Sequence, residues 1–224
     1  MLAFFLILFA ASLANSCPTP SGDSAGVPFV NVTTNGGSWL DNAGDGFGEP
    51  LNVIISGESS AEVLTQPGLL RWAQSIGFST ECLGIHLGAP QSANLGDGNG
   101  FVNQTIELRE DYGVAEDGTC LESLIGGNHF RVYVQNGTLA PTGAFFLAVS
   151  KEEDAFDDHN IVPDGYNIGR DEMVAGAVGM TTFDGTTFNT TAVNMTNAMP
   201  AGSAGVNHGI AVDGAVILLT IMIV

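Results

Sequence analysis

The feature that most constrains the fold is a series of short apolar runs separated by glycine-rich segments. Leu51 to Ser56 and Gly143 to Val149 are nearly continuous apolar stretches, which is typical of strands buried on both faces. His129 to Val134 alternates between polar and apolar residues, so one face of this strand is apolar and the other is polar. Further strands are expected at 78–83 and 101–108. Together these runs predict a central sheet.

Two amphipathic helices are predicted between the strands. The first covers 69–76, where apolar residues recur at positions i, i+3, i+4 and i+7, and it ends at Gly77. The second covers about 168–178 and ends at Gly179. The pattern predicts a single small α/β or α+β domain over residues 48–180, with a central sheet, two or three helices and one core.

The segments on either side of this domain are expected to be irregular. Residues 17–47 are rich in Gly, Ser, Asn, Thr and Pro, which favours a disordered lead-in. Residues 181–202 are rich in Thr and Asn and offer little to bury. They are therefore predicted to form a disordered, glycosylated stalk.

Residues 1–16 have the order of a secretory signal peptide. An apolar stretch from Leu2 to Leu13 is followed by Ala14 and Ser16, which lie at positions −3 and −1 for cleavage before Cys17. The basic residues that usually open such a signal are missing. The alternative is an N-terminal apolar helix retained in the core.

The C-terminal end resembles a lipid-anchor signal. Residues 214–224 form an apolar tail that is too short to be a stable membrane span. Small residues and a polar spacer precede the tail, with Gly202 as the predicted attachment residue. Residues 203–224 are therefore predicted to be a removed glycosylphosphatidylinositol signal, and the protein is expected at the outer cell surface or cell wall. The alternative is a buried C-terminal strand.

Two further features agree with export. Three cysteines are present, and Cys82 and Cys120 fall inside the predicted domain, so they are the expected disulfide pair in an oxidising compartment. Cys17 lies at the predicted cleavage point and has no assigned role. Five N-x-S/T sequons predict an N-linked glycoprotein, at Asn31, Asn103, Asn136, Asn189 and Asn194.

The charge of the chain restricts its partners. Five basic residues face 24 acidic ones, for a net charge of −19. Such a surface repels nucleic acid and anionic lipid, so nucleic acid is excluded and membrane contact is expected only through the anchor. Divalent cations, basic proteins and neutral glycans remain possible partners. The alternative is that the charge only keeps a surface protein soluble.

Five segments follow one another in an order that resembles a known family. They are a strand, a helix ending at glycine, a His-x-Arg strand, an apolar strand and a His…Asp…Arg-Asp segment, and here they read LNVIISGES, LLRWAQSIGF, HFRVYVQ, GAFFLAVS and HNIVPDGYNIGRDEMV. In this arrangement the chain resembles the LssY C-terminal domain family, and more closely a group of secreted fungal proteins that share that domain. The resemblance covers about Glu49 to Gly179.

The resemblance implies little about function. Bacterial members often carry the domain attached to a membrane phosphatase of the phosphatidic-acid type, whose chemistry rests on separate Lys/Arg-rich and Ser-Gly-His motifs. This chain contains neither motif, and Lys151 is its single lysine. The phosphatase activity therefore does not carry over.

The best candidates for a site lie on the polar face of the alternating strand. His129, Arg131 and Tyr133 share this face, where they could hold a carboxylate, phosphate or sugar. His159 and Arg170 are expected near the same sheet. Arg131, Tyr133 and Arg170 are therefore predicted binding residues, and His129 and His159 are candidates for a catalytic acid and base. The alternative is a solvated strand face and a charged loop.

Standard catalytic and metal-binding motifs are absent from the sequence. It contains no G-x-S-x-G, H-E-x-x-H or P-loop, and the EF-hand-like stretch from Asp41 to Gly46 has Ala43 where an oxygen ligand is needed. The sequence thus predicts no cofactor and no metal. Two functions remain as hypotheses: a non-enzymatic surface glycoprotein that binds or shields, and an anchored extracellular hydrolase that uses the two histidines.

Overall fold

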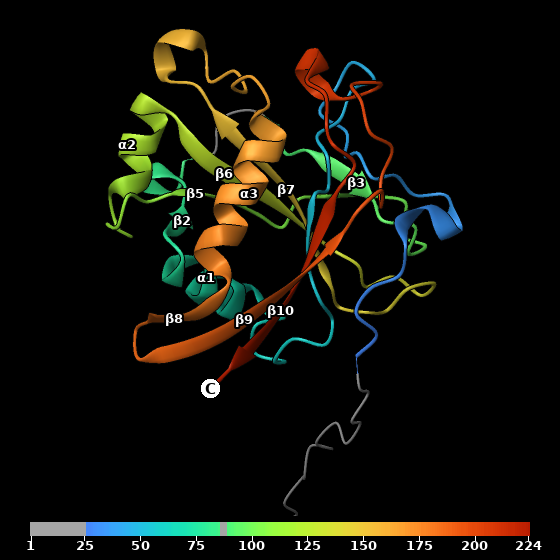
Figure 1. Cartoon of the computed structure of the whole chain (residues 1–224), viewed down its shortest axis with the longest axis horizontal. Helices are drawn as coiled ribbons and strands as arrows, with labels where there is room; N and C mark the ends of the chain where they lie inside the picture. The colour runs from blue at the N-terminus through green and yellow to red at the C-terminus, as the bar shows by residue number, and fades with distance from the viewer. Residues whose placement is uncertain (1–25, 86–88) are drawn as a thin grey trace, which may run out of the picture.

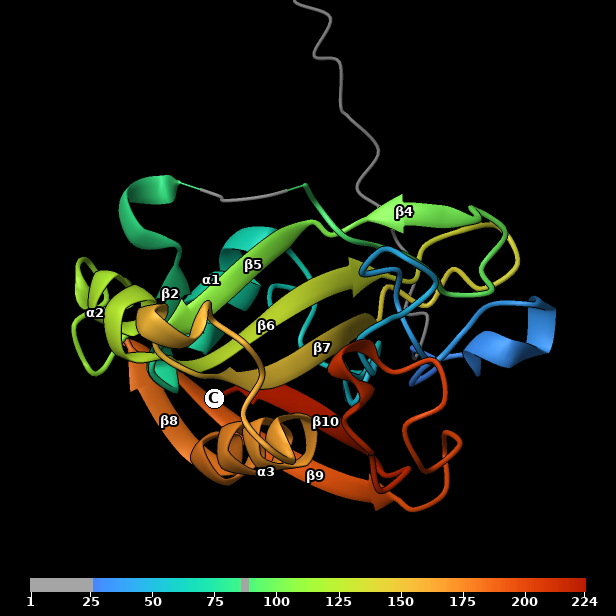
Figure 2. The same ribbon diagram turned by 90° about the horizontal axis from the view of Figure 1, so that it is seen from above.

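The computed structural model describes residues 26–85 and 89–224 (Figure 1). The predicted signal peptide, Cys17 and the start of the lead-in lie outside the described residues. Three α-helices and a curled eight-stranded sheet make up one small α+β domain in this part of the chain, which confirms the predicted fold class (Figure 2). The strand order is β2-β5-β6-β7-β1-β10-β9-β8, and β3 pairs with β4 in a separate hairpin.

The predicted strands and helices between residues 51 and 178 lie close to observed ones, whereas α2, β3, β8, β9 and β10 were not predicted. The large sheet consists of β1 (Val53–Ile55), β2 (Phe78–Thr80), β5 (Ile106–Glu110), β6 (Gly127–Val134), β7 (Phe145–Glu152), β8 (Gly179–Phe183), β9 (Thr186–Met195) and β10 (Val216–Ile223). The hairpin is β3 (Ser92–Asn94) and β4 (Phe101–Asn103), and the α-helices are α1 (Gln66–Ser75), α2 (Gly118–Ile125) and α3 (Gly165–Ala177). Short 3-10 turns are η1 (Val32–Asn35), η2 (Cys82–Gly84), η3 (Ala155–Asp157) and η4 (Asn207–Gly209).

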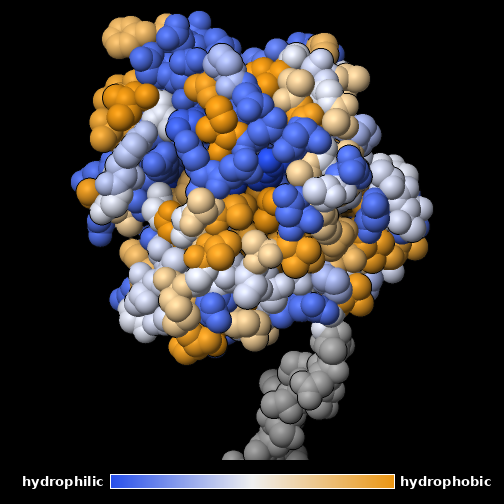
Figure 3. All heavy atoms as spheres, viewed as in Figure 1, coloured by the Kyte–Doolittle hydropathy of each residue, from blue (hydrophilic) through white to orange (hydrophobic). Residues whose placement is uncertain are grey.

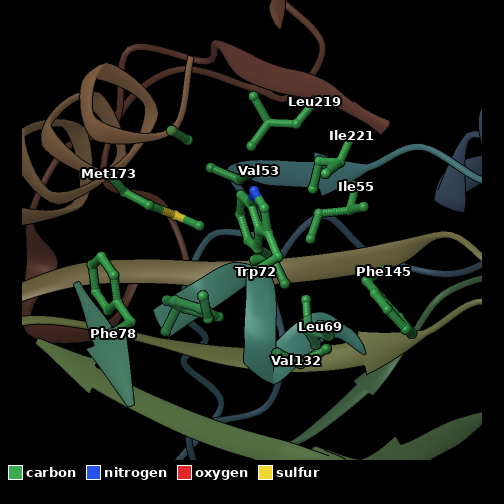
Figure 4. Packing of buried hydrophobic residues seen from close by; sticks show 14 of the residues in the cluster. Val53, Ile55, Leu69, Trp72, Phe78, Val132, Phe145, Met173, Leu219 and Ile221 are labelled. Carbon is green, nitrogen blue, oxygen red and sulfur yellow. The ribbon is translucent and has the colours of Figure 1, made fainter. Parts of the chain in front are cut away.

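The sheet separates two hydrophobic cores, because successive side chains of a strand point to opposite faces. Phe145, Leu147 and Val149 of β7 contribute to the first core, which the sheet shares with α1 and α3. Trp72 of α1 lies at its centre, with the aliphatic side chains of β1 and β10 close by (Figure 4). Phe146 points into the second core, on the other face.

The lead-in is not disordered from residue 26 onward, and the predicted boundary at residue 48 is not a domain boundary. Val32 and Trp39 are buried in the second core, and the ring of Trp39 lies 6.2 Å from that of Phe146. Leu40 forms a β-bridge with Pro50. The face of β7 that carries Phe146 is apolar and must be shielded from water. The lead-in shields it with a few apolar side chains, although its overall composition is polar.

The prediction of a disordered stalk at residues 181–202 is also wrong, because most of this segment is folded into the sheet. Residues 179–183 and 186–195 form β8 and β9, the last two strands of the large sheet. Phe188 and Thr190 of β9 are buried on one face. Threonine is a good strand former, and a strand with one face exposed needs few apolar residues. The Thr- and Asn-rich composition therefore did not indicate the hairpin of β8 and β9.

The C-terminal tail is a strand inside the sheet. β10 pairs in parallel with β1 and antiparallel with β9, and Val216, Leu219 and Ile221 are buried. This arrangement agrees with the alternative to a lipid-anchor signal, a buried C-terminal strand. Removal of residues 203–224 would take away the strand that joins β1 to β9, so the anchor prediction and this fold concern different forms of the chain. Within the described residues, no helix is long and apolar enough to span a membrane.

The position of β10 gives a direct stability test. Leu219→Ala should lower the free energy of unfolding by about 2–5 kcal/mol, because it leaves a cavity in the first core. Met222→Ala, on the same strand but exposed, should change it by less than about 0.5 kcal/mol. Chemical denaturation of both variants measures the difference, and equal effects would mean that β10 is not part of the folded sheet.

Candidate functional site

The polar face of β6 carries three predicted site residues, and it is buried. His129, Arg131 and Tyr133 share the face, as the alternation predicts, but His129 and Tyr133 have no exposed surface. The Arg131 side chain keeps 12% of its surface exposed. The alternative of a solvated strand face is therefore wrong, because the lead-in and the loops after β7 cover this face.

One end of the face is closed by the lead-in. Tyr133 Oη donates a hydrogen bond of 2.7 Å to Asp41 Oδ2, and Asp41 Oδ1 accepts one of 2.7 Å from the backbone N–H of Glu49. The Glu49 carboxylate in turn accepts from Arg131 Nη1 at 2.6 Å. Tyr133 is thus a structural partner of Asp41 and does not reach a pocket.

Arg131 is surrounded by groups that match its charge. In addition to its bond with Glu49, Arg131 forms an ion pair with Glu107. Its Nε lies 3.2 Å from Glu107 Oε2, but the geometry is not that of a hydrogen bond. Its Nη1 also lies 3.0 Å from His129 Nε2. Because a guanidinium can only donate, this contact assigns an acceptor role to Nε2 and the proton of the neutral ring to Nδ1.

A second arginine, Arg109 of β5, organises the other end of the face. Its Nη1 donates to both Glu122 oxygens at 3.1 Å and to Glu152 Oε2 at 2.8 Å. Its Nη2 donates to Glu107 Oε1 at 2.8 Å. We call Glu49, Glu107, Arg109, Glu122, His129, Arg131, Glu152 and His159 the polar cluster.

Sequence reasoning missed most of this cluster. Glu107 and Arg109 alternate on β5 and lie directly opposite Arg131 and His129 in the register, so the pattern of β5 carried a usable signal. Glu152 lies three residues beyond the predicted end of its strand. Glu49 and Glu122 come from distant segments, and no local pattern identifies them.

Glu152 brings the two candidate histidines together. Its Oε1 lies 3.3 Å from His129 Nδ1, and its Oε2 lies 3.6 Å from His159 Nδ1. His159 follows η3 and has a φ of 53°, a left-handed conformation that histidine adopts more readily than most residues. Its side chain is 37% exposed. The two histidines therefore flank one carboxylate, one deeply buried and one open to solvent.

Arg170 does not belong to the site. It forms a bidentate pair with Asp213, at 2.7 and 2.8 Å, and donates to the carbonyl of Ala215. This arginine thus links α3 to the loop before β10. These partners occupy its guanidinium in the structure, so the prediction that Arg170 binds a ligand gains no support from its position.

A cavity of about 250 Å³ opens onto the polar cluster. Its lining residues are Glu81, Cys82, Ile85, Arg109, Ser123, Arg131, Glu152 and His159. We call it the cluster pocket. The predicted disulfide between Cys82 and Cys120 is present and ties η2 to α2 at its rim. Leu121 and Leu124 of α2 are exposed. Figure 3 shows hydrophobic and hydrophilic atoms side by side on this face of the molecule. The pocket has room for a small ligand.

Burial shifts the protonation of the cluster. It raises the pKa of Glu122 to about 7, against the opposing effect of Arg109. Burial, together with Arg131 and Arg109, lowers the pKa of His129 well below its usual value, so this ring is neutral. The cluster contains four carboxyl groups, at Glu49, Glu107, Glu122 and Glu152, but only two guanidinium groups. The surplus of acid favours a cation or a neutral ligand over an anion.

The cluster also contains the side chains that could hold a metal. Glu122, His129 and Glu152 are all buried, and one ligand atom from each lies within 4.8 Å of the others. Comparisons with protein-family models, curated proteins and solved structures find no match to this chain. The resemblance to the LssY C-terminal domain family therefore stays a prediction, and the site rests on its own geometry.

Arg131 is expected to contribute to the stability of the fold. Arg131→Ala removes a guanidinium partner from two buried carboxylates, Glu49 and Glu107, of which Glu107 keeps Arg109, and should cost roughly 3–5 kcal/mol of stability. Arg71→Ala on the exposed face of α1 is the matched control, with an expected change under about 0.5 kcal/mol. Thermal melts separate the two, and a small effect at Arg131 would show that this charge is solvated.

Asp41 should make stability depend on pH. Burial, and then the charge of Glu49, raise the pKa of Asp41 from 3.8 to about 7. The folded protein therefore holds a proton that the unfolded chain releases near pH 4, so stability is lost as pH rises towards 7, by on the order of 1 kcal/mol per pH unit. Asp41→Asn cannot titrate; its Oδ1 can still accept from the Glu49 N–H, and its Nδ2 can donate to Tyr133 Oη in place of the bond that Asp41 accepts.

Melting temperatures measured across this pH range provide the test. The wild type should fall more steeply than Asp41→Asn, and comparison of the two isolates Asp41 from Glu122, whose raised pKa acts in the same direction. Parallel curves for the two proteins would contradict a raised pKa at Asp41.

Proposed function

We propose that this protein is an exported N-linked glycoprotein that binds a small neutral or cationic molecule in the cluster pocket. The observation that carries the proposal is a pocket whose floor consists of buried, charged side chains. Buried ion pairs are costly to desolvate and contribute little to stability compared with apolar packing. Their concentration beneath one opening is typical of a binding site.

Export and glycosylation are supported by the position of the sequons. All five sequon asparagines are exposed: Asn31, Asn103, Asn136, Asn189 and Asn194. The Asn31 Oδ1 caps η1 by accepting the Thr33 N–H. Its Nδ2, the atom that carries an N-linked glycan, is not used in that cap. The disulfide at the pocket rim is also typical of an oxidising compartment.

The surface charge and the size of the cluster pocket restrict the class of molecule that can bind there. A basic protein cannot enter a cavity of about 250 Å³, so it can bind only elsewhere on the acidic surface. A monosaccharide or a small organic cation fits both the volume and the acid surplus.

We also propose that the working form keeps residues 203–224, because β10 lies between β1 and β9. The lipid-anchored form remains the alternative.

Hydrolysis is the second candidate. It is favoured by one observation, the shared contact of His129 and His159 with Glu152. His129 has no exposed surface, so only His159 can meet a substrate directly. An acid–base pair needs both groups within reach of the reacting atoms, which places this function second.

The export proposal is tested by expression in a eukaryotic secretory host. We expect the protein in the medium, a mass decrease on treatment with a peptide N-glycosidase, and an intact C-terminal peptide containing β10. Retention on cells with release by a phosphatidylinositol phospholipase, and loss of that peptide, would instead establish the anchored form.

Binding is tested by thermal shift with a panel of monosaccharides and small organic cations. A member that raises the melting temperature of the wild type should fail with Ser123→Trp, which fills the pocket from α2. Leu124→Trp, exposed on the same helix, is the control. No shift with any member, or an equal shift in both variants, would reject the pocket. Turnover of nitrophenyl esters that depends on His159 would favour the hydrolase.

A further inference from the structure

Two buried histidine nitrogens face the same carboxylate without a hydrogen bond. Among the described residues, neither His129 Nδ1 nor His159 Nδ1 has a hydrogen-bond partner. Both point towards Glu152, at 3.3 and 3.6 Å. His129 is completely buried. A buried ring nitrogen without a partner is rare in folded proteins, and such an atom is commonly satisfied by an ordered water or a bound ion.

The surrounding atoms are suited to a metal ion. Glu122, His129 and Glu152 each offer a ligand atom, and these atoms lie within 4.8 Å of one another. Zinc binds imidazole nitrogen and carboxylate oxygen at roughly 2.0–2.2 Å, so binding draws these side chains closer together around the ion. Imidazole together with carboxylates favours zinc and related transition ions over calcium or magnesium, which prefer oxygen alone.

We propose that Glu122, His129 and Glu152 bind a zinc ion at the floor of the cluster pocket, with His159 as the fourth ligand. The proposal adds a metal where the sequence motifs predicted none. It concerns the floor of the pocket and holds whether or not an organic molecule binds above it. The ion reaches the site through the opening, since Glu152 and His159 both line the pocket.

Arg109 is the resident cation that zinc must replace. Its Nη1 contacts Glu122 and Glu152. In the structure the same guanidinium also lies 2.8 Å from Glu107 and 3.8 Å from Glu81, so these carboxylates are available to it when Glu122 and Glu152 bind the metal. A divalent ion then takes the place of a single positive charge beside Glu122 and Glu152, and the arginine keeps carboxylate partners.

The other nitrogen of His129 can adapt to the metal. Binding through Nδ1 moves the ring proton to Nε2, which lies 3.3 Å from Ser150 Oγ. The serine hydroxyl can accept this proton, an arrangement that commonly orients metal-binding histidines. Arg131 gives up its contact with Nε2 but retains Glu49 and Glu107.

The test uses the full folded protein, stripped with a chelator and then titrated with zinc alone. Calorimetry and elemental analysis should give one bound zinc per chain, and zinc should raise the melting temperature. Glu122→Gln and His159→Ala should each weaken binding by at least about tenfold. His208→Ala removes an exposed histidine on η4 and should leave binding unchanged. Circular dichroism checks that the variants fold.

Cobalt substitution supplies a second readout. A four-coordinate site with two imidazoles should give intense visible absorption that Glu122→Gln weakens. The proposal is overturned if stripped protein binds no zinc, or if His208→Ala reduces binding as much as His159→Ala. Secretion, glycosylation and organic-ligand shifts are measured separately, so failure of the metal site leaves the proposed function standing.

Discussion

Arg131 lies in the middle of β6, and much of the structure serves to match its buried charge. One face of this strand completes the first core, so the other face must carry every polar residue of the alternation. That face is not left to water. Glu49 arrives from the segment just after the lead-in and Glu107 from β5, and each places a carboxylate against the guanidinium. The lead-in itself is held by Trp39 in the second core and by the hydrogen bond between Asp41 and Tyr133.

Arg109 repeats this arrangement at the other end of the strand pair. It gathers carboxylates from α2, β5 and β7, elements that are far apart in the chain. Such a network stabilises the fold only while its charges stay matched, because each member is costly to bury alone. The same dependence ties the cluster to pH, because the pKa of Glu122 is raised to about 7, whereas purely apolar packing has no group that titrates.

The sequence predicts the sheet well because apolar runs such as 143–149 leave few alternatives to buried strands. It fails where polar composition hides a structural role, as in the lead-in and in β9, whose single buried face needs only Phe188 and Thr190. At the site, alternation correctly puts His129, Arg131 and Tyr133 on one face. It cannot reveal burial, since Asp41, Glu49 and Glu122 reach that face through tertiary contacts that no local pattern encodes.

The pairing of β1 with β10 has a consequence for how the molecule forms in the cell. These neighbours in the middle of the sheet are separated by about 160 residues, and β9 and β8 join the sheet only through β10. A nascent chain can pair β5, β6 and β7 early, but one edge of β1 stays open until residues 216–223 have emerged from the ribosome. Contacts of such long range form slowly, and an unpaired apolar edge invites aggregation. The middle of this sheet is therefore completed late, and until β10 pairs with β1 the free edge of β1 is open to non-native pairing.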